Sequence, residues 1–183
     1  MKRLEQGVYF ITGSYGVGKT TMCQQLSKAF GLPYFSASEL ISLKNNEVYG
    51  ANKAVKNKEE NQHILSREIE QKLLKYPTFF LNGHTTIFKK DHTVDLLPTE
   101  PFKHFHLAAM ILLEAPPFSV LEHLNKRDQI LYSKEEIFSL IEAERERAQS
   151  ISEKLQIPFI RHLMKYDDTD CSLLVELLQR VEL

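Results

Sequence analysis

Residues 13–20 have the types and spacing of a loop that binds phosphate groups. Gly13, Gly18, Lys19 and Thr20 fill every fixed position of the pattern G-x-x-x-x-G-K-[ST]. Glycines let successive backbone N–H groups converge on one anion, and the N-terminus of a following helix adds a positive partial charge. In such a loop the lysine reaches the β- and γ-phosphates, and the final hydroxyl ligates Mg²⁺. The sequence therefore predicts a cradle for ATP and Mg²⁺, formed by Gly13, Ser14, Tyr15, Gly16, Val17, Gly18, Lys19, Thr20 and Thr21.

The segments on either side of this loop are those that a phosphate cradle needs. The apolar, β-branched and aromatic run 8–12 predicts a buried strand. After the loop, Met22, Leu26, Ala29 and Phe30 recur at helical spacing, so a helix is predicted over 21–30. Strand, loop and helix in succession place the cradle at the carboxyl end of the strand.

The rest of the chain alternates between short apolar runs and amphipathic segments, which is typical of a parallel sheet covered on both faces. We predict one domain over 1–183, with the α/β three-layer P-loop NTPase fold and a five-stranded, mainly parallel sheet. Ligands then sit beyond the carboxyl ends of the strands. Residues 83–105 are predicted to be a long functional loop, and 44–60 a polar loop or helical turn. The predicted strands are 8–12, 33–36, 78–81, 107–113 and 157–160, and the predicted helices are 21–30, 38–43, 59–76, 117–126, 133–155 and 169–181.

Composition and charge exclude several classes of protein. The formal net charge is −1, so no overall positive field draws the chain to nucleic acid. No stretch is long and apolar enough to predict a membrane span. The two cysteines, Cys23 and Cys171, have neither the number nor the spacing for a disulfide framework or a zinc site. These features favour a reduced, cytoplasmic protein.

Three further stretches occur in the order and spacing of the adenylate kinases. Residues 32–40 resemble their second strand and substrate-side helix, and residues 79–84 resemble their third strand. Residues 110–128 resemble their fourth strand and the helix that leads to the lid. The likeness is greatest to the archaeal-type adenylate kinases and to the small adenylate kinase/ATPases of the nucleus and of ribosome assembly. It implies an acceptor-side insert over about 37–76 and a short lid over about 127–133.

Asn82 departs from that family, which has aspartate at this position. The aspartate normally holds Mg²⁺ through water, and a hard cation prefers charged oxygen. Asparagine keeps an acceptor but lacks the charge, so three interpretations remain open. Metal binding is weakened with activity retained, another acid such as Glu114 or Glu39 compensates, or the protein binds a nucleotide with little turnover. We assign Thr20 and Asn82 as the metal-site candidates.

Candidate catalytic and acceptor-binding residues follow from the same resemblance. His84 follows the strand end by two residues, as in the related enzymes, and could orient a water or contact the acceptor; otherwise it is a loop histidine bonded to backbone. Arg127 stands where the family has its lid arginine. Arg147 matches an Arg-Ala pair in the archaeal-type enzymes, and its neighbour Arg145 faces another way. The predicted catalytic residues are Lys19, Arg127, Arg147 and His84, and the predicted acceptor-binding residues are Ser38, Glu39, Arg67 and Thr85.

These observations favour an enzyme that transfers the γ-phosphoryl of MgATP to a nucleotide or similar small acceptor. A second hypothesis is a slow ATPase or nucleotide switch that acts with a protein or ribonucleoprotein partner, because Asn82 replaces the usual acid. A third is a kinase for a non-nucleotide metabolite or an RNA end. A GTPase is disfavoured, because the sequence contains no N-K-x-D guanine signature.

Overall fold

The computed structural model describes residues 4–45, 58–89, 91–128 and 131–180. Part of the predicted acceptor-side insert, residues 46–57, lies outside the described residues, and so do residues 129 and 130 of the predicted lid. None of the helices within the described ranges has the length and apolar character that crossing a bilayer requires. Both cysteines are free thiols, as the sequence predicts.

A five-stranded parallel sheet forms the centre of the molecule, in the strand order β2-β3-β1-β6-β7. The register aligns Ile11 with Asn82 and Gly13 with Leu113, so the carboxyl ends of β1, β3 and β6 meet at one edge. Every pairing in this sheet is parallel, and the predicted fold class is confirmed. The strands are β1 (Gly7–Gly13), β2 (Tyr34–Ser36), β3 (Thr78–Asn82), β6 (Leu107–Glu114) and β7 (Phe159–Leu163).

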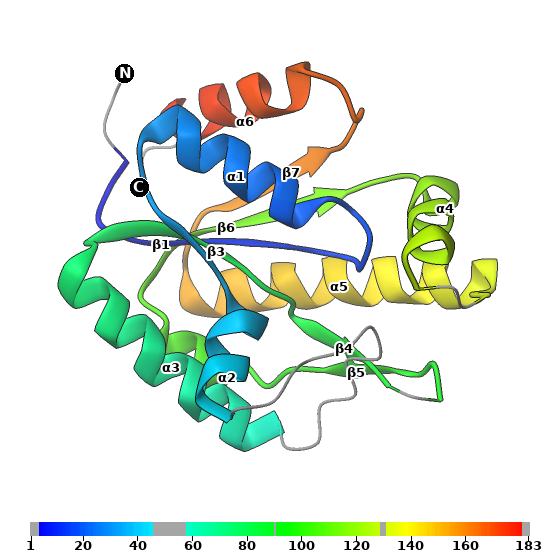
Figure 1. The fold of residues 1–183 in the computed structure, drawn as a ribbon, viewed down its shortest axis with the longest axis horizontal. Helices are drawn as coiled ribbons and strands as arrows, with labels where there is room; N and C mark the ends of the chain where they lie inside the picture. The colour runs from blue at the N-terminus through cyan, green and yellow to red at the C-terminus, as the bar shows by residue number, and fades with distance from the viewer. Residues whose placement is uncertain (1–3, 46–57, 90, 129–130, 181–183) are drawn as a thin grey trace.

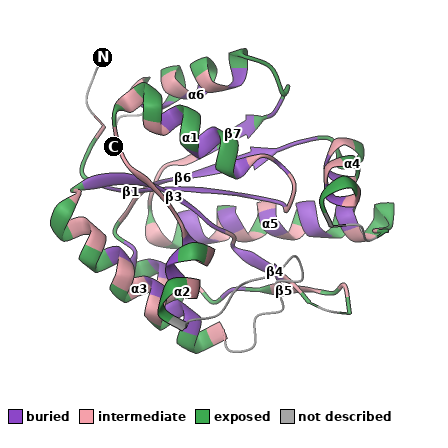
Figure 2. Ribbon diagram, viewed as in Figure 1, coloured by how far each residue is buried: buried purple, intermediate pink, exposed green. Residues whose placement is uncertain are grey.

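Helices cover both faces of this sheet (Figure 1). On one face α1 (Lys19–Phe30) and α6 (Thr169–Arg180) bury Met22, Leu26 and Leu174. On the other face α3 (Lys58–Lys75) and α5 (Lys134–Leu155) bury Leu65 and Ile151, among others. The central strands β1 and β3 are buried along their whole length (Figure 2). Strands buried on both faces are expected to be continuous apolar runs, and 8–11 and 109–113 have that character.

Two further helices begin at the edge of the sheet where the strands end. Helix α2 (Ala37–Asn45) follows β2 directly, and α4 (Pro117–Asp128) follows β6. Helix α5 begins at the predicted capping box: Glu136 N donates to Ser133 Oγ at 3.1 Å, and Ser133 N donates to Glu136 Oε2 at 2.7 Å. The cap fixes the point at which the chain re-enters a helix after the predicted lid.

Residues 83–105 are more ordered in structure than the predicted loop. They form the antiparallel pair β4 (Thr86–Phe88) and β5 (Val94–Leu96), followed by the 3₁₀ helix η1 (Glu100–His104). The turn between the strands has no glycine: the Asp91 carboxylate accepts from the Thr93 N–H at 3.1 Å, and His92 adopts φ 62°. Because turn prediction relies on glycine and asparagine at such positions, the hairpin was not predicted.

Candidate active site

The phosphate cradle lies between β1 and α1, as the sequence predicts. Gly18 caps the N-terminus of α1 with φ 98°, a left-handed conformation that other residues adopt only with strain. At Gly13, φ is 147°, and a Cβ atom would overlap the Leu113 carbonyl oxygen. Val17 is fully buried in the core, so it anchors the loop from below. The backbone N–H groups and the positive end of α1 are therefore held towards the same space.

Lys19 lies over this loop. Its side chain is only 7% exposed, and Nζ donates to the carbonyl oxygens of Gly13 at 2.8 Å and Ser14 at 2.9 Å. These bonds hold the ammonium group beside the backbone N–H groups of the cradle. An anion bound there would gain a charge-assisted contact in addition to the backbone donors.

The residues around the cradle line an open cleft at the carboxyl edge of the sheet, which we call the phosphate cleft. Most of the predicted site residues meet here, although they come from four separate segments of the chain. The β1–α1 loop and α1 form one wall, β2 and α2 a second, the end of β3 a third and α4 a fourth. The lining residues are Tyr15, Gly16, Gly18, Lys19, Thr20, Thr21, Ser36, Ser38, Glu39, Asn82, Gly83, His84, His123 and Arg127.

The two predicted metal-site residues are in direct contact. Asn82 Nδ2 donates to Thr20 Oγ1 at 3.0 Å, and Asn82 is 8% exposed. The described residues contain no cluster of three or more His, Cys, Asp or Glu side chains that could hold a metal alone. A Mg²⁺ ion that keeps several waters and binds mainly through phosphate oxygens needs only one or two protein ligands. The Thr20 hydroxyl and the Asn82 side chain fit that requirement.

Replacing Asn82 with aspartate is expected to lower the Mg²⁺ concentration needed for half-maximal ATP binding by about tenfold, through one added charge–charge interaction near the metal. The same charge repels metal-free ATP, so affinity without Mg²⁺ falls. Titrations of ATP with and without Mg²⁺ measure both effects. Weaker binding of MgATP by a folded variant would contradict the metal role of position 82.

His84 and Tyr15 stack against each other in the lining of the cleft. Their rings stack with centroids 3.9 Å apart and an interplanar angle of 19°. Burial raises the pKa of the Tyr15 phenol, so its hydroxyl stays protonated at neutral pH. The stack holds His84 beside Tyr15 of the cradle loop, in the lining of the cleft.

Three of the predicted catalytic and acceptor-binding residues do not line the phosphate cleft. Arg147 donates from Nε to the Leu97 carbonyl at 2.7 Å and from Nη2 to Thr99 Oγ1 at 3.0 Å, so it holds the segment between β5 and η1. Arg67 lies on the exposed side of α3. Thr85 is fully buried, and its N–H donates to Glu144.

The two possible substitute acids are also separated by the structure. Glu39 lines the phosphate cleft. Glu114, at the end of β6, accepts from Arg145 Nε and pairs with Arg161 Nη2 at 2.8 Å. Two arginines therefore hold Glu114, and of the two acids only Glu39 is placed near the cradle. The bond to Glu114 also explains where the Arg145 side chain lies.

A buried carboxylate, Glu144, lies behind the site and was not predicted from the sequence. Glu144 on α5 is 1% exposed and accepts from the Thr12 and Thr86 hydroxyls and from the Thr85 N–H, the last at 2.9 Å. It ties the end of β1, which leads into the cradle, to the segment that follows His84. One feature of the sequence could have indicated that Glu144 is buried. It lies at helical spacing between Ile141 and Ala148, on the apolar side of a helix that is otherwise charged.

His123 on α4 is a second residue that the sequence did not single out. Its Nδ1 donates to the Gly16 carbonyl at 3.0 Å, and its ring lies edge-on to Tyr166 at 4.9 Å. The bond fixes the tautomer with hydrogen on Nδ1. Helix α4 and the segment after β7 thus meet at the tip of the cradle.

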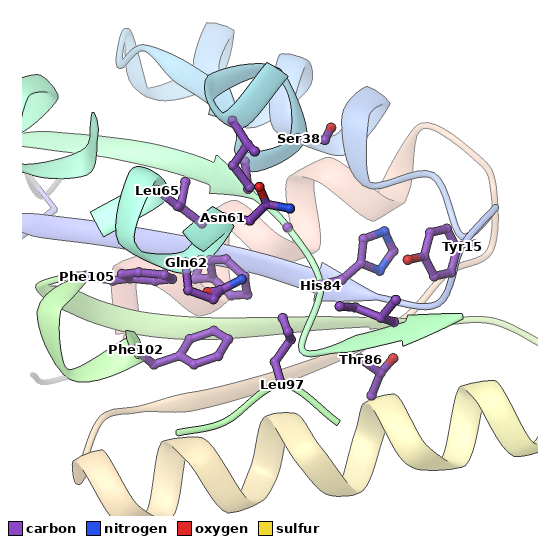
Figure 3. Close-up of a pocket in the computed structure, with 15 residues that line it drawn as sticks. Tyr15, Ser38, Asn61, Gln62, Leu65, His84, Thr86, Leu97, Phe102 and Phe105 are labelled. Atoms are coloured by element: carbon purple, nitrogen blue, oxygen red, sulfur yellow. The ribbon is translucent and has the colours of Figure 1, made fainter. Parts of the chain in front are cut away.

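A second, largely apolar cavity adjoins the phosphate cleft (Figure 3), and we call it the apolar pocket. Helices α2 and α3 supply one side, β4 and η1 another, and the Tyr15–His84 stack the end nearest the cradle. Four residues, Tyr15, Ser38, Gly83 and His84, line both spaces. The pocket is lined by Phe10, Tyr15, Ala37, Ser38, Ile41, Asn61, Gln62, Leu65, Gly83, His84, Thr86, Ile87, Leu97, Phe102 and Phe105.

Comparison with protein families places this geometry in a known group. Residues 12–140, which start at the end of β1 and include the whole cradle, match the family described as AAA domain. The chain belongs to this AAA domain family. No curated protein matches the sequence significantly.

Solved structures share the fold at low sequence identity. A gluconokinase from Sinorhizobium meliloti 1021 superposes with a TM-score of 0.61 at 11% identity, covering 98% of this chain and 94% of that one. A shikimate kinase from Acinetobacter baumannii, in complex with shikimate, gives 0.60 at 16% identity, covering 95% and 92%. A shikimate kinase from Bacteroides thetaiotaomicron gives 0.60 at 16% identity, covering 96% and 97%. This AAA domain protein therefore has the fold of the P-loop kinases.

Proposed function

We propose that the protein is a phosphotransferase that binds MgATP in the phosphate cleft and passes the γ-phosphoryl to a small acceptor, a nucleotide or a similar molecule. One observation carries the proposal: the cleft brings Lys19, Thr20 and Arg127 together with Asn82 and His84. Two cations, the Thr20–Asn82 pair and a histidine therefore line one cleft at the carboxyl ends of β1 and β3. That arrangement suits transfer of a charged group between two bound molecules.

The proposed reaction forms no bond to the protein. An acceptor hydroxyl oxygen bonds to the γ-phosphorus, the bond from that phosphorus to the β–γ bridging oxygen breaks, and ADP leaves. His84 takes the hydroxyl proton, while Lys19 and Arg127 stabilise the negative charge on the phosphoryl oxygens. When bound, Mg²⁺ would neutralise further phosphate charge, held by Thr20 and Asn82.

The comparisons support a small-molecule acceptor and leave its identity open. The solved relatives are named for the kinases of gluconate and shikimate, and one of them binds shikimate. The collinear resemblance to adenylate kinases supports a nucleotide. We also propose a cytoplasmic location, which the free thiols of Cys23 and Cys171 support.

A nucleotide switch with slow ATP hydrolysis and a protein or ribonucleoprotein partner is the second candidate function. Asn82 favours it, because the amide has no charge with which to hold the metal. The two functions differ in one measurable property. A kinase forms ADP in proportion to an acceptor, whereas a switch forms it without one.

Replacing Arg127 with alanine is expected to lower kcat of acceptor-dependent ADP formation by about a hundredfold, with a smaller effect on ATP affinity, because the guanidinium acts on charge that develops during transfer. Lys126→Ala is the matched control, since Lys126 is exposed, pairs with Glu122 and lies outside the cleft. Steady-state kinetics with and without acceptors separate the effects. If no acceptor changes the rate of ADP formation, the switch is favoured. If Arg127→Ala changes only KM, Arg127 binds substrate and does not act on the transition state.

A further inference from the structure

The apolar pocket has no cation along its described lining. Of the residues that line it, His84 alone can carry a positive charge, and it is shared with the phosphate cleft. The cations Lys19 and Arg127 line the cleft instead. Arg67, which was predicted to bind the acceptor, is exposed and lines neither space. A phosphate or carboxylate in the pocket would lose its hydration without gaining a lysine or arginine from the described lining, and an anion that is buried without a counter-ion costs several kcal/mol.

Aromatic side chains line two ends of the pocket, and such a lining suits a flat, uncharged ring. The Phe10 and Phe102 rings meet edge-to-face at 5.7 Å, and the Phe102 and Phe105 rings lie 5.1 Å apart. The stacked Tyr15 and His84 rings close the opposite end (Figure 3). Aromatic walls of this kind favour a planar ligand through offset or edge-to-face contacts.

Two amides give this pocket a polar edge. Asn61 and Gln62 on α3 are 6% and 8% exposed, and both line the pocket (Figure 3). The Gln62 Oε1 atom is buried and accepts no hydrogen bond from any residue within the described ranges. Burying a hydrogen-bond acceptor without a donor costs free energy. A ligand that places an N–H group beside Gln62 Oε1 would supply the missing donor and would bind more tightly for that reason. Amide side chains read the donor and acceptor edge of a heterocyclic base.

From these observations we infer that the acceptor is an uncharged nucleoside, with its base in the apolar pocket and its reacting hydroxyl beside His84. The inference rests on the proposed function and narrows its acceptor from a nucleotide or similar molecule to a nucleoside. Ser38 and Gly83 also line both spaces, so a ligand in the pocket passes them to reach the cleft. The products are then ADP and a nucleoside monophosphate.

Binding to the wild-type protein without ATP tests this directly. Isothermal titration with adenosine, guanosine, cytidine and uridine is compared with their 5′-monophosphates, shikimate and gluconate. At least one nucleoside is expected to bind tenfold or more tightly than its own monophosphate and than either sugar acid. Gln62→Met is expected to weaken that nucleoside about tenfold, whereas Gln25→Met, an exposed glutamine on α1, leaves it unchanged.

A parallel titration with MgATP separates failure of the inference from failure of the proposed function. If MgATP binds but no nucleoside does, or if a monophosphate or sugar acid binds more tightly, the nucleoside inference is overturned and the phosphotransferase proposal stands. If MgATP itself does not bind, the proposed function is overturned. Because the first comparison uses only wild-type protein, it does not depend on whether the Gln62 variant folds.

Discussion

Replacing Lys19 with alanine is expected to lower kcat/KM for MgATP by about a thousandfold or more while leaving the fold intact. A charge-assisted bond to phosphate contributes roughly 1.5–3 kcal/mol to binding, and loss of a donor to the developing charge costs a further factor of about 10²–10³ in turnover. The fold should tolerate the change, because Lys19 Nζ donates to the Gly13 and Ser14 carbonyls, which both lie on a loop.

Titration calorimetry with ATP and thermal unfolding measure the two parts of this expectation. Lys28→Ala is the control, since Lys28 is an exposed lysine in the last turn of the same helix. Unchanged ATP affinity in the Lys19 variant would contradict the proposal that the cradle binds the phosphates of ATP.

Replacing Glu144 with alanine is expected to reduce the free energy of unfolding by roughly 3–4 kcal/mol, because three buried donors lose their acceptor at about 1–3 kcal/mol each, less some relief by water. Those donors are the Thr12 and Thr86 hydroxyls and the Thr85 N–H. ATP affinity should also fall, since Thr12 leads into the cradle. Chemical denaturation followed by circular dichroism gives the stability change.

Glu146→Ala provides the comparison for Glu144. Glu146 stands two residues further along α5 and is exposed, so its removal should change stability by less than about 0.5 kcal/mol. Equal stability of the two variants would mean that the Glu144 network does not hold the site together.

The sheet and its helices could be predicted because their signals are local. Continuous apolar runs marked the buried strands β1 and β6, and helical spacing marked α1 and α3. The cradle could be predicted for the same reason, because its chemistry lies within eight successive residues, 13–20. The β4–β5 hairpin was missed, since an aspartate and a histidine make its turn.

The roles of charged residues on α5 depend on long-range contacts that spacing does not reveal. Residues 145 and 147 were predicted to face different ways, and they do: Arg145 bonds Glu114, and Arg147 bonds the Leu97 carbonyl. Which target each would find depends on the packing of β6 and β5 against the helix. The role of Glu144 likewise depends on its contacts with Thr12 and Thr86, which are far from it in the sequence and lie beside it only in the folded chain.

The apolar pocket could not be predicted for a related reason. Its walls come from segments far apart in the chain, with Phe10 on β1, Gln62 on α3 and Phe102 on η1. Each residue alone has the pattern of ordinary core packing. Only the arrangement in space separates a ligand pocket from a core.

The fate of the γ-phosphoryl group is the most direct test of the central claim. ATP labelled in that group is incubated with Mg²⁺, the protein and each candidate acceptor, and the products are separated from inorganic phosphate. The account predicts label in a phosphorylated acceptor, formed by the wild type and almost absent with Lys19→Ala. Label recovered only as inorganic phosphate, at a rate that no acceptor changes, would contradict it.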